Sequence, residues 1–311
     1  MSIDFDTLLQ DINRSKLRVK IPRKFVFFCG GAINPDNEQQ ASLRGYLWKN
    51  HRIGDEETSY ILAEDAQNLF RDSGYKDLIT FEEDIARIAS VVLVTSESAG
   101  SLCEIGAFCA NEVVSPVLRV LISENHYNDD SFVRFGPIER LQNTYNRAVI
   151  GVFPWEVDQD YKIIPEKADP HVKAIIRFIE EHVEKSPETK LYPKDKESAI
   201  FFDILWVISI ANIISPEPLY DLVRKIYPDM VDAQIRRKIY AMMVAKWVGK
   251  VNYGGRDYYY LTTLQDPYQY AFNEDVKQKE PTRRIFPIRE DWSASISEEV
   301  RDRVIQARGG A

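Results

Sequence analysis

Short apolar segments that end at small or acidic residues constrain the fold of this chain more than any other feature. Residues 24–31 (KFVFFCGG) stop at two glycines, and residues 90–98 (SVVLVTSES) stop at a serine-rich loop. Segments that are apolar at every position predict strands buried on both faces of a sheet. Strands that alternate with helices predict an α/β domain with a Rossmann-like, mostly parallel sheet. Further strands are predicted over 58–65, 116–124 and 146–153, and helices over 37–50, 80–90 and 98–114.

The pattern changes after residue 198, which predicts a second domain. Three helices followed by a hairpin around two glycines are typical of a small winged helix-turn-helix domain. The helices are expected over 199–213, 215–228 and 232–247, and the hairpin over 248–262. The predicted parts of the chain are an N-terminal helix or arm (1–24), the α/β domain (25–185), a linker (186–198), the winged helix-turn-helix domain (199–264) and a C-terminal extension (265–311).

The charge balance and the cysteines narrow the classes of function. The 311 residues include 40 Lys and Arg against 48 Asp and Glu, and this net charge of −8 disfavours a chain that coats nucleic acid along its whole length. Three cysteines without a C-x-x-C pair argue against a disulfide scaffold and a zinc site, so no metal is expected. The apolar runs are shorter than the ~18 residues that span a bilayer. No secretory signal precedes Pro22, so a cytoplasmic location without membrane contact is expected.

The segment from Ser98 to Gly106 follows a predicted strand and begins a helix. Its small residues let backbone N–H groups approach a ligand oxygen at the positive end of the helix. Glu104 would lie one turn into that helix, where a carboxylate could attack a sugar carbon and form a glycosyl intermediate. Ser101 and Glu104 also have the spacing of a capping box, and spacing alone favours that structural role. Gly30 and Gly31 follow a buried strand, which suits a close backbone approach to a ligand.

Further acidic residues are candidates for the same site. Glu82, Glu83 and Asp84 lie on an amphipathic helix, where one of them could protonate a leaving base or hold ribose hydroxyls. A charged first turn, favoured by the helix dipole, is the better interpretation for at least two of them. Glu64 and Asp65 end a predicted strand, where ribose-binding acids often occur. Asp65 is equally suited to a helix N-cap.

Basic residues of the second domain form a candidate nucleic-acid interface. Arg236, Arg237 and Lys238 lie on the helix expected to enter a groove, and Lys250 and Arg256 lie on the predicted hairpin. Phosphate contacts from these side chains would be sensitive to salt. A winged helix can also bind another protein while its basic residues are simply solvated, and the sequence leaves both interpretations open.

Five segments, taken in their order along the chain, resemble the nucleoside 2-deoxyribosyltransferase-like effector proteins of bacterial retrons. The most specific is SESAGSLCEIGAF (96–108), with FVRFGPI (132–138) downstream of it. The other three are FVFFCGG (25–31), LAEDAQNLF (62–70) and FEEDIARIASVVLV (81–94). The winged helix-turn-helix layout also matches that family, so the resemblance covers most of the chain.

The resemblance implies a nucleoside deoxyribosyltransferase-like catalytic domain in which Glu104 is the catalytic glutamate. The implied enzyme is an N-glycosidase that hydrolyses NAD⁺ to nicotinamide and ADP-ribose, with NAD⁺ as substrate and no cofactor. An assisting acid is implied on the helix over 80–90, with Glu82 placed first and Asp84 next. The implied substrate-binding residues are Gly30, Gly31, Glu64, Ser98, Gly100 and Ser101.

The resemblance also implies the toxin of a retron anti-phage system that acts by abortive infection. The implied partners are the retron reverse transcriptase and its multicopy single-stranded DNA–RNA hybrid, which would hold the toxin inactive. Enzymes of the deoxyribosyltransferase type build their sites between subunits, so a homo-oligomer is expected. Two alternatives stay open: a deoxynucleotide N-glycosidase or deoxyribosyltransferase, and a nucleotide-sensing DNA-binding regulator.

Overall fold

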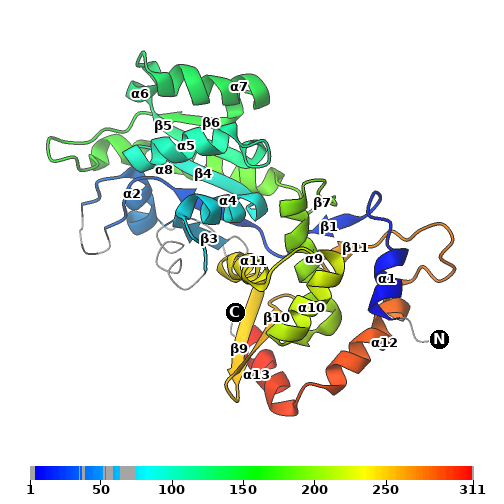
Figure 1. Ribbon diagram of the computed structural model, residues 1–311. Helices are drawn as coiled ribbons and strands as arrows, with labels where there is room; N and C mark the ends of the chain where they lie inside the picture. Colours follow the sequence, from blue (N-terminus) through cyan, green and yellow to red (C-terminus); the bar gives the residue numbers. More distant parts are fainter. Residues whose placement is uncertain are drawn as a thin grey trace. The chain divides into compact units, whose positions relative to one another are not determined.

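Two compact units make up the chain in the computed structural model (Figure 1). The structure describes residues 4–34, 36, 39–51, 53, 59–63 and 74–309. We call Lys24–Phe70 with Asp77–Ser186 the α/β unit, and Met1–Arg23 with Arg71–Lys76 and Pro187–Ala311 the helical unit. Among the described residues, no helix combines the length and the apolar character needed to cross a membrane.

A five-stranded parallel sheet forms the centre of the α/β unit. The strands are ordered β3-β2-β4-β5-β6, and every neighbouring pair is parallel. All residues of β2 and β4 are buried, which explains why these segments are apolar throughout. The predicted α/β class with a parallel sheet is therefore confirmed. The strands are β2 (Phe25–Cys29), β3 (Ser59–Leu62), β4 (Val91–Ser96), β5 (Leu118–Ser123) and β6 (Ile150–Phe153).

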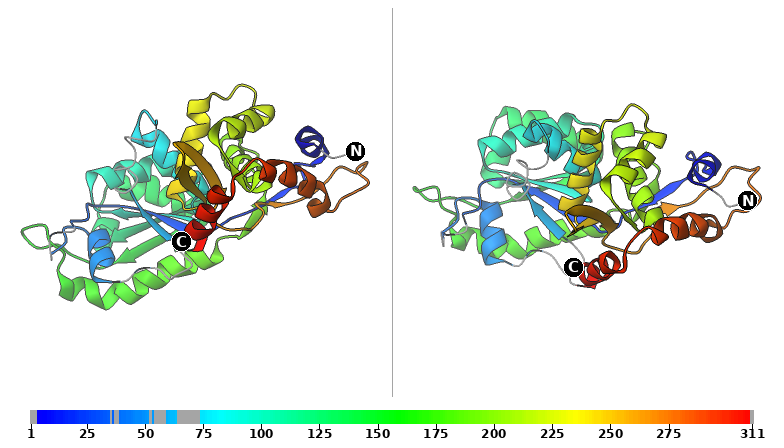
Figure 2. Two further views of the ribbon diagram at one scale, coloured as in Figure 1. Left: turned by 90° about the horizontal axis from the view of Figure 1, so that it is seen from below. Right: turned by 60° about the horizontal axis from the view of Figure 1, so that its bottom comes forward.

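Helices cover both faces of this sheet. α2 (Leu43–Asn50) and α8 (Pro165–Lys185) lie on one face, as the left view of Figure 2 shows. There Leu47 and Ile175 pack in one core cluster with Leu93 of β4. Figure 1 shows α4 and α5 on the other face. Within the described residues, the other helical segments of this unit are α4 (Leu78–Ile88), α5 (Ala99–Ala110), η1 (Ser115–Val117), α6 (Glu124–Asn128), the π-helix η2 (Arg134–Ile138), α7 (Glu139–Tyr145) and η3 (Arg147–Val149).

The direction of the strand order reverses between β2 and β4. From β2 the chain passes to the edge strand β3 and then returns to β4 on the other side of β2. The connections that leave the carboxyl ends of β2 and β4 therefore diverge, and ligands of open α/β sheets bind in the crevice at such a point. The segments that follow these two strands, Gly30–Gly31 and 97–98, both lie at that edge.

The helical unit contains three consecutive helices and a small antiparallel sheet of order β8-β10-β9. The predicted hairpin is confirmed, since β9 and β10 pair in antiparallel register around Gly254 and Gly255. Both glycines have positive φ (58° and 76°), as a two-residue hairpin turn requires. The elements are α9 (Lys196–Ala211), β8 (Ile213–Ile214), α10 (Pro216–Ile226), α11 (Asp232–Val244), β9 (Val248–Tyr253) and β10 (Arg256–Leu261).

The segments predicted as an arm, a linker and an extension each contribute a strand to a second sheet of this unit. The sheet has the antiparallel order β11-β1-β7, and β7 lies inside the predicted linker. Strands of two or three residues are too short to show an alternating pattern, so the sequence did not reveal them. Their bounds are β1 (Arg18–Lys20), β7 (Thr189–Leu191) and β11 (Tyr268–Gln269), and the flanking helices are α1 (Phe5–Asp11), α12 (Pro281–Ala294) and α13 (Glu298–Gly309).

Candidate active site

Glu97, directly after β4, lies in the crevice between the carboxyl ends of β2 and β4. Its Oε1 accepts hydrogen bonds from the backbone N–H groups of Gly31 (3.0 Å) and Arg44 (3.2 Å). Its Oε2 accepts one from the N–H of Leu43 (2.6 Å). Burial raises the pKa of Glu97 to about 7 in spite of these three donors. Glu97 therefore ties the loop after β2 to the first turn of α2, a structural role that the sequence did not reveal.

Arg44 of α2 places a buried positive charge at the same edge. Its Nε donates a hydrogen bond to the backbone oxygen of Gly31, and its Nη1 donates one to the backbone oxygen of Phe28, both at 2.9 Å. The residue is completely buried. The Arg44 charge lowers the pKa of Glu104, partly offsetting the effect of burial. The guanidinium and the Glu104 carboxylate are therefore within electrostatic reach of each other.

Gly30 and Gly31 are required by packing inside the α/β unit. A Cβ atom on Gly31 would lie 2.6 Å from Cβ of Ser42, and one on Gly30 would lie 3.1 Å from both Arg44 and Glu97. Gly30 also has φ of +155°, a conformation that favours glycine. These contacts account for both glycines without a ligand, so their approach to a substrate stays a prediction.

Two serines close the first turn of α5. Oγ of Ser98 accepts a hydrogen bond from the N–H of Ser101 (3.1 Å), and Oγ of Ser101 accepts one from the N–H of Ser98 (2.9 Å). This reciprocal pair is the capping box of the helix, with Gly100 exposed between its members. The capping box predicted between Ser101 and Glu104 is therefore wrong, and Glu104 is not needed to cap the helix.

Glu104, in the second turn of α5, combines partial burial with an incomplete set of hydrogen bonds. Its Oε2 is buried and has no hydrogen-bond partner among the described residues. Burial raises the pKa of Glu104. A buried polar atom without a partner costs stability, and such carboxylates are typical of functional sites.

Glu82 of α4 is electrostatically coupled to Glu104. α4 ends just before β4 begins, so its N-terminal half lies at the carboxyl edge of the sheet, where α5 starts. Burial and, secondly, the charge of Glu104 raise the pKa of the buried Glu82 to about 7. Burial raises the pKa of Cys29, at the end of β2, and the charges of Glu104 and Glu82 raise it further. Cys29, Glu82 and Glu104 are thus within electrostatic reach of one another near the reversal point of the sheet.

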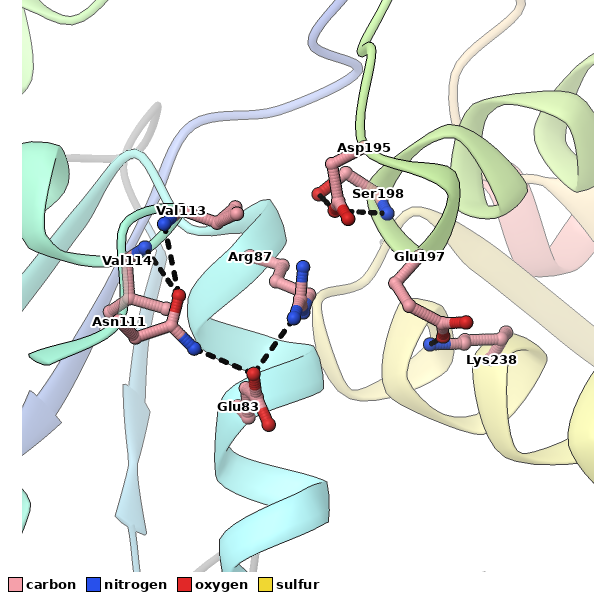
Figure 3. A network of polar contacts seen from close by, with 9 residues as sticks. All are labelled: Glu83, Arg87, Asn111, Val113, Val114, Asp195, Glu197, Ser198 and Lys238. Atoms are coloured by element: carbon pink, nitrogen blue, oxygen red, sulfur yellow. Dashed lines mark hydrogen bonds and ion pairs between the residues drawn. The ribbon is translucent and has the colours of Figure 1, made fainter. Parts of the chain in front are cut away.

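Glu83, the neighbour of Glu82, makes contacts that are structural (Figure 3). Its Oε1 accepts hydrogen bonds from Arg87 (2.7 Å) and from Nδ2 of Asn111 (2.6 Å), which links α4 to the C-terminal end of α5. Asp84 is buried on the same helix. α4 has no acidic residue in its first turn, so the interpretation of these acids as a charged first turn is wrong.

A pocket of about 380 Å³ lies at the carboxyl ends of β4 and β5. The loop after β4 and the first two turns of α5 form one wall, through Ser98, Ala99 and Leu102. His126 of α6 and Val133 contribute the opposite side. The lining is mostly apolar. Among the described residues, Ser98 is thus the one predicted substrate-binding residue that lines this pocket, and Glu104 is not among its lining residues.

Comparison with known proteins identifies the family. Residues 40–250, more than half of the chain, match the family described as STM3845 retron effector protein. The chain belongs to this family. The predicted retron effector is therefore confirmed at the level of the family.

Two relatives of this retron effector occur in Escherichia coli, and both are named provisionally as a ribosyltransferase/DNA-binding protein. The protein of retron Ec73 is 28% identical over 137 residues, and that of retron Ec86 is 27% identical over 129 residues. Each match covers 40% of the present chain. The matches cover 41% and 39% of the relatives, so the shared region spans about two fifths of their length.

One predicted site residue of the retron effector is not among the residues that the structure describes. Glu64 lies outside the described residues, as does Asp65, so the proposed contact of Glu64 with sugar hydroxyls stays a prediction. Within the described ranges, no three histidine, cysteine or acidic side chains come together as ligands of a metal ion would.

Lys238 does not have the exposure that was expected of a phosphate-binding residue. Its ammonium pairs with the carboxylate of Glu197 at 2.8 Å (Figure 3) and lies 4.8 Å from the ring centre of Phe201. The side chain is 7% exposed. A phosphate would have to compete with a formed ion pair at a buried position, so the prediction for Lys238 is corrected to a structural role.

The other predicted basic residues are more accessible. Arg236 and Arg256 are exposed. Lys250 is exposed and pairs with Asp257 across the hairpin at 3.1 Å. The guanidinium of Arg237 lies 5.7 Å from the ring centre of Tyr75. Arg236 and Arg256 are therefore the predicted residues best placed to meet a phosphate.

Proposed function

We propose that this retron effector is an N-glycosidase that hydrolyses NAD⁺ to nicotinamide and ADP-ribose, with Glu104 as nucleophile. The observation that carries the proposal is the coupled pair of carboxylates at the reversal point of the sheet. Glu104 has an unpaired buried oxygen near the positive charge of Arg44, while the pKa of Glu82 is raised to about 7. A pair in which one carboxyl group is ionised and the other holds a proton suits glycosyl transfer. The names of both relatives include ribosyltransferase.

In the first step, a carboxylate oxygen of Glu104 forms a bond to C1′ of the ribose as the bond from C1′ to the pyridinium nitrogen breaks. The bonding electron pair passes to that nitrogen, so nicotinamide leaves as a neutral molecule and needs no proton. The transition state carries positive charge on the ribosyl group, which the Glu104 carboxylate stabilises. Glu82 remains protonated during this step, because two adjacent carboxylates in a buried site do not both ionise readily.

In the second step, water attacks C1′ and the bond to Glu104 breaks, with its electron pair returning to the carboxylate. Glu104 is neutral while it is esterified, so its charge no longer raises the pKa of Glu82. Burial, the larger cause, still raises the pKa of Glu82, but this pKa falls, so Glu82 releases its proton to solvent more readily and can then accept one from the attacking water. We assign Asp84, like Glu82, as an acid that assists Glu104. Gly100 and Ser101 are assigned to shape the site at the start of α5. No cofactor takes part.

The experiment is to incubate the purified chain with NAD⁺ and to follow nicotinamide release beside Glu104→Gln. The substitution removes the nucleophilic charge with little change of shape, so we expect release to fall by at least about 10³-fold. Glu83→Gln is the matched control, since Glu83 is held by Arg87 and Asn111. Equal release by the wild type and Glu104→Gln would contradict the role of Glu104. Release of a base from deoxynucleotides instead of NAD⁺ would indicate the deoxynucleotide enzyme.

We also propose that residues 196–261 form a winged helix-turn-helix domain that binds the nucleic acid of the retron. The order of one helix, a short strand, two helices and a hairpin that pairs with that strand supports this assignment. Both relatives are named as DNA-binding proteins. In this proposal Arg236 lies on the helix that enters the groove, and Arg256 and Lys250 lie on the wing.

Binding to the multicopy DNA–RNA hybrid, measured over a range of salt concentrations, tests the second proposal. The double variant Arg236→Ala/Arg256→Ala should weaken binding and reduce the salt slope by about one for each phosphate that the protein no longer neutralises. Arg283→Ala is the control, because Arg283 is an exposed arginine of α12. If the double variant has the affinity and salt slope of the control, this interface is excluded. The remaining interpretation is then that the domain binds another protein.

We further propose that the protein is the toxin of a cytoplasmic anti-phage system, held inactive by the retron reverse transcriptase and its hybrid. The retron effector family supports this proposal. The active form is proposed to be a homo-oligomer. Adding the reverse transcriptase with its hybrid should suppress nicotinamide release, and light scattering should give a mass above that of one 36.0 kDa chain. An unaffected rate would contradict the inhibition, and a monomer that retains full activity would contradict the oligomer.

A further inference from the structure

We infer that the pocket at the carboxyl ends of β4 and β5 binds the second nucleoside of a dinucleotide substrate. This is the half of the substrate that does not contain the bond attacked by Glu104. The inference rests on the proposed N-glycosidase function and specifies its substrate class. It is carried by the place of the pocket relative to Glu104, by the character of its lining and by an exposed aromatic ring beside it.

The pocket and Glu104 lie on opposite sides of α5. Leu102 lines the pocket, and at about 100° per residue Leu102 and Glu104 point roughly 160° apart around the helix axis. Along the axis, Ala99 at the pocket wall and Glu104 are separated by about 7.5 Å. The pocket is therefore not where C1′ meets Glu104, and a ligand that uses both must extend past the start of α5.

The start of α5 can accommodate the link between two nucleosides. The capping box occupies the N–H groups of Ser98 and Ser101, and Leu102 N–H bonds to the backbone oxygen of Ser98. The capping box leaves the N–H groups of Ala99 and Gly100 unused, and the first turn contains no acidic residue. Unbonded N–H groups at the positive end of a helix stabilise phosphate oxygens, such as those of a pyrophosphate bridge.

The lining of the pocket suits a nucleoside. Its volume of about 380 Å³ lies within the range of small-molecule sites. Ala99, Leu102 and Val133 give apolar walls for the faces of a heterocyclic base. His126 and Asp129 also line the pocket, and their polar atoms can bond to ring nitrogens and ribose hydroxyls.

Phe132 is an exposed aromatic residue that neighbours this pocket in the sequence, although it is not itself a lining residue. It stands between Ser131 and Val133, which both line the pocket, and it is 86% exposed. Its ring rests on Gly136, where a Cβ atom would lie 3.3 Å from it. An exposed aromatic ring beside an apolar pocket is typical of sites that stack a nucleobase. Phe135 is 60% exposed in the same segment, but it is not flanked by lining residues and its ring lies under the guanidinium of Arg134, so it provides a matched control.

The test compares the hydrolysis of NAD⁺ with that of nicotinamide mononucleotide, which has the same scissile bond but lacks the second nucleoside. Leu102→Trp fills the pocket and should raise KM for NAD⁺ at least about tenfold, because the second nucleoside can then no longer enter. Phe132→Ala should raise it about fivefold or more, because the base can no longer stack. Neither variant should change kcat/KM for the mononucleotide more than about twofold. Phe135→Ala should leave KM and kcat/KM unchanged for both substrates. Equal effects on both substrates, or none on either, would overturn the inference.

A binding measurement separates this inference from the proposed function. ADP-ribose is titrated calorimetrically into the wild type and Leu102→Trp, with circular dichroism to verify that the variant is folded. Binding by the wild type that is absent in Leu102→Trp supports the pocket even if no preparation hydrolyses NAD⁺, in which case the proposed function alone fails. Hydrolysis of NAD⁺ together with equal ADP-ribose binding by both proteins would overturn the pocket assignment alone.

Discussion

Two carboxylates, one in each unit, differ in how many hydrogen-bond partners they have. Asp203 of α9 is completely buried and accepts hydrogen bonds from three tyrosine hydroxyls, while the guanidinium of Arg14 lies 3.4 Å from its Oδ2. Glu104 of α5 has a buried Oε2 without a partner in the described structure. The tyrosines that bond to Asp203 are Tyr192, Tyr227 and Tyr268.

The difference between these carboxylates separates a structural role from a chemical one. Burial raises the pKa of both groups. At Asp203 the hydroxyls and Arg14 offset this effect, so that the network joins α9 to segments on both ends of the chain. At Glu104 the main offset is the charge of Arg44. A fully satisfied buried network specifies the fold, whereas an unsatisfied group lowers stability and is retained where it serves function.

The largest effect on stability is expected from the isosteric pair Asp203→Asn and Glu104→Gln. Asp203→Asn removes the charge that three hydroxyls and Arg14 surround, and should lower the free energy of unfolding by about 2–4 kcal/mol. Glu104→Gln removes a charge whose buried Oε2 has no hydrogen-bond partner among the described residues, and it should leave this free energy within about 0.5 kcal/mol or raise it. Urea unfolding of both variants makes the comparison. If Glu104→Gln loses as much stability as Asp203→Asn, the distinction between a structural Asp203 and a chemical Glu104 is contradicted.

The second prediction concerns pH and follows from the raised pKa of Glu82. Its pKa is about 7 in the folded protein against an ordinary value of 4.5, so the folded state binds the extra proton between these values. The free energy of unfolding should therefore fall as the pH rises from 4.5 to 7, by up to about 1.4 kcal/mol per pH unit from this group. Glu82→Gln should lose this part of the slope relative to the wild type. An unchanged slope would show that Glu82 is not desolvated in the folded protein.

The smallest effect is expected in the helical unit, at Lys238. Lys238→Met removes a buried ammonium whose partner Glu197 is half exposed, so we expect a loss of about 1 kcal/mol in the free energy of unfolding. Arg256→Met, at an exposed position, should change it by less than about 0.5 kcal/mol. Thermal unfolding of the two variants tests whether Lys238 supports the fold. Equal midpoints would favour a solvated Lys238 that is free to bind phosphate.

Much of the α/β unit could be predicted because parallel strands are apolar on both faces. The segments 25–29 and 91–96 show this in the sequence, and the hairpin around Gly254 and Gly255 has an equally local signal. The strands β1, β7 and β11 were missed because each has only two or three residues. Their pairing depends on contacts between distant parts of the chain, which no local pattern records.

The candidate site was only partly predictable for the same reason. Glu104 was proposed from a short motif and Glu82 from the resemblance to the retron effectors, and both roles stay predictions. The capping box was assigned to the wrong pair because Ser98 and Glu104 are both three residues from Ser101. Arg44 and Glu97 were missed, since their importance depends on the reversal of strand order that brings α2 to the end of β4. The burial of Lys238 likewise depends on a partner 41 positions away.

The most direct test of the central claim is to trap the bond between Glu104 and the ribosyl group. Glu82→Gln lacks the base for the second step, so the glycosyl ester should accumulate when this variant is mixed with NAD⁺ and quenched in acid. Intact-mass and peptide measurements should then show an added ADP-ribosyl group on the peptide that contains Glu104, and none in Glu82→Gln/Glu104→Gln. Release of nicotinamide by Glu82→Gln with no adduct, or with the adduct on another residue, would contradict the account.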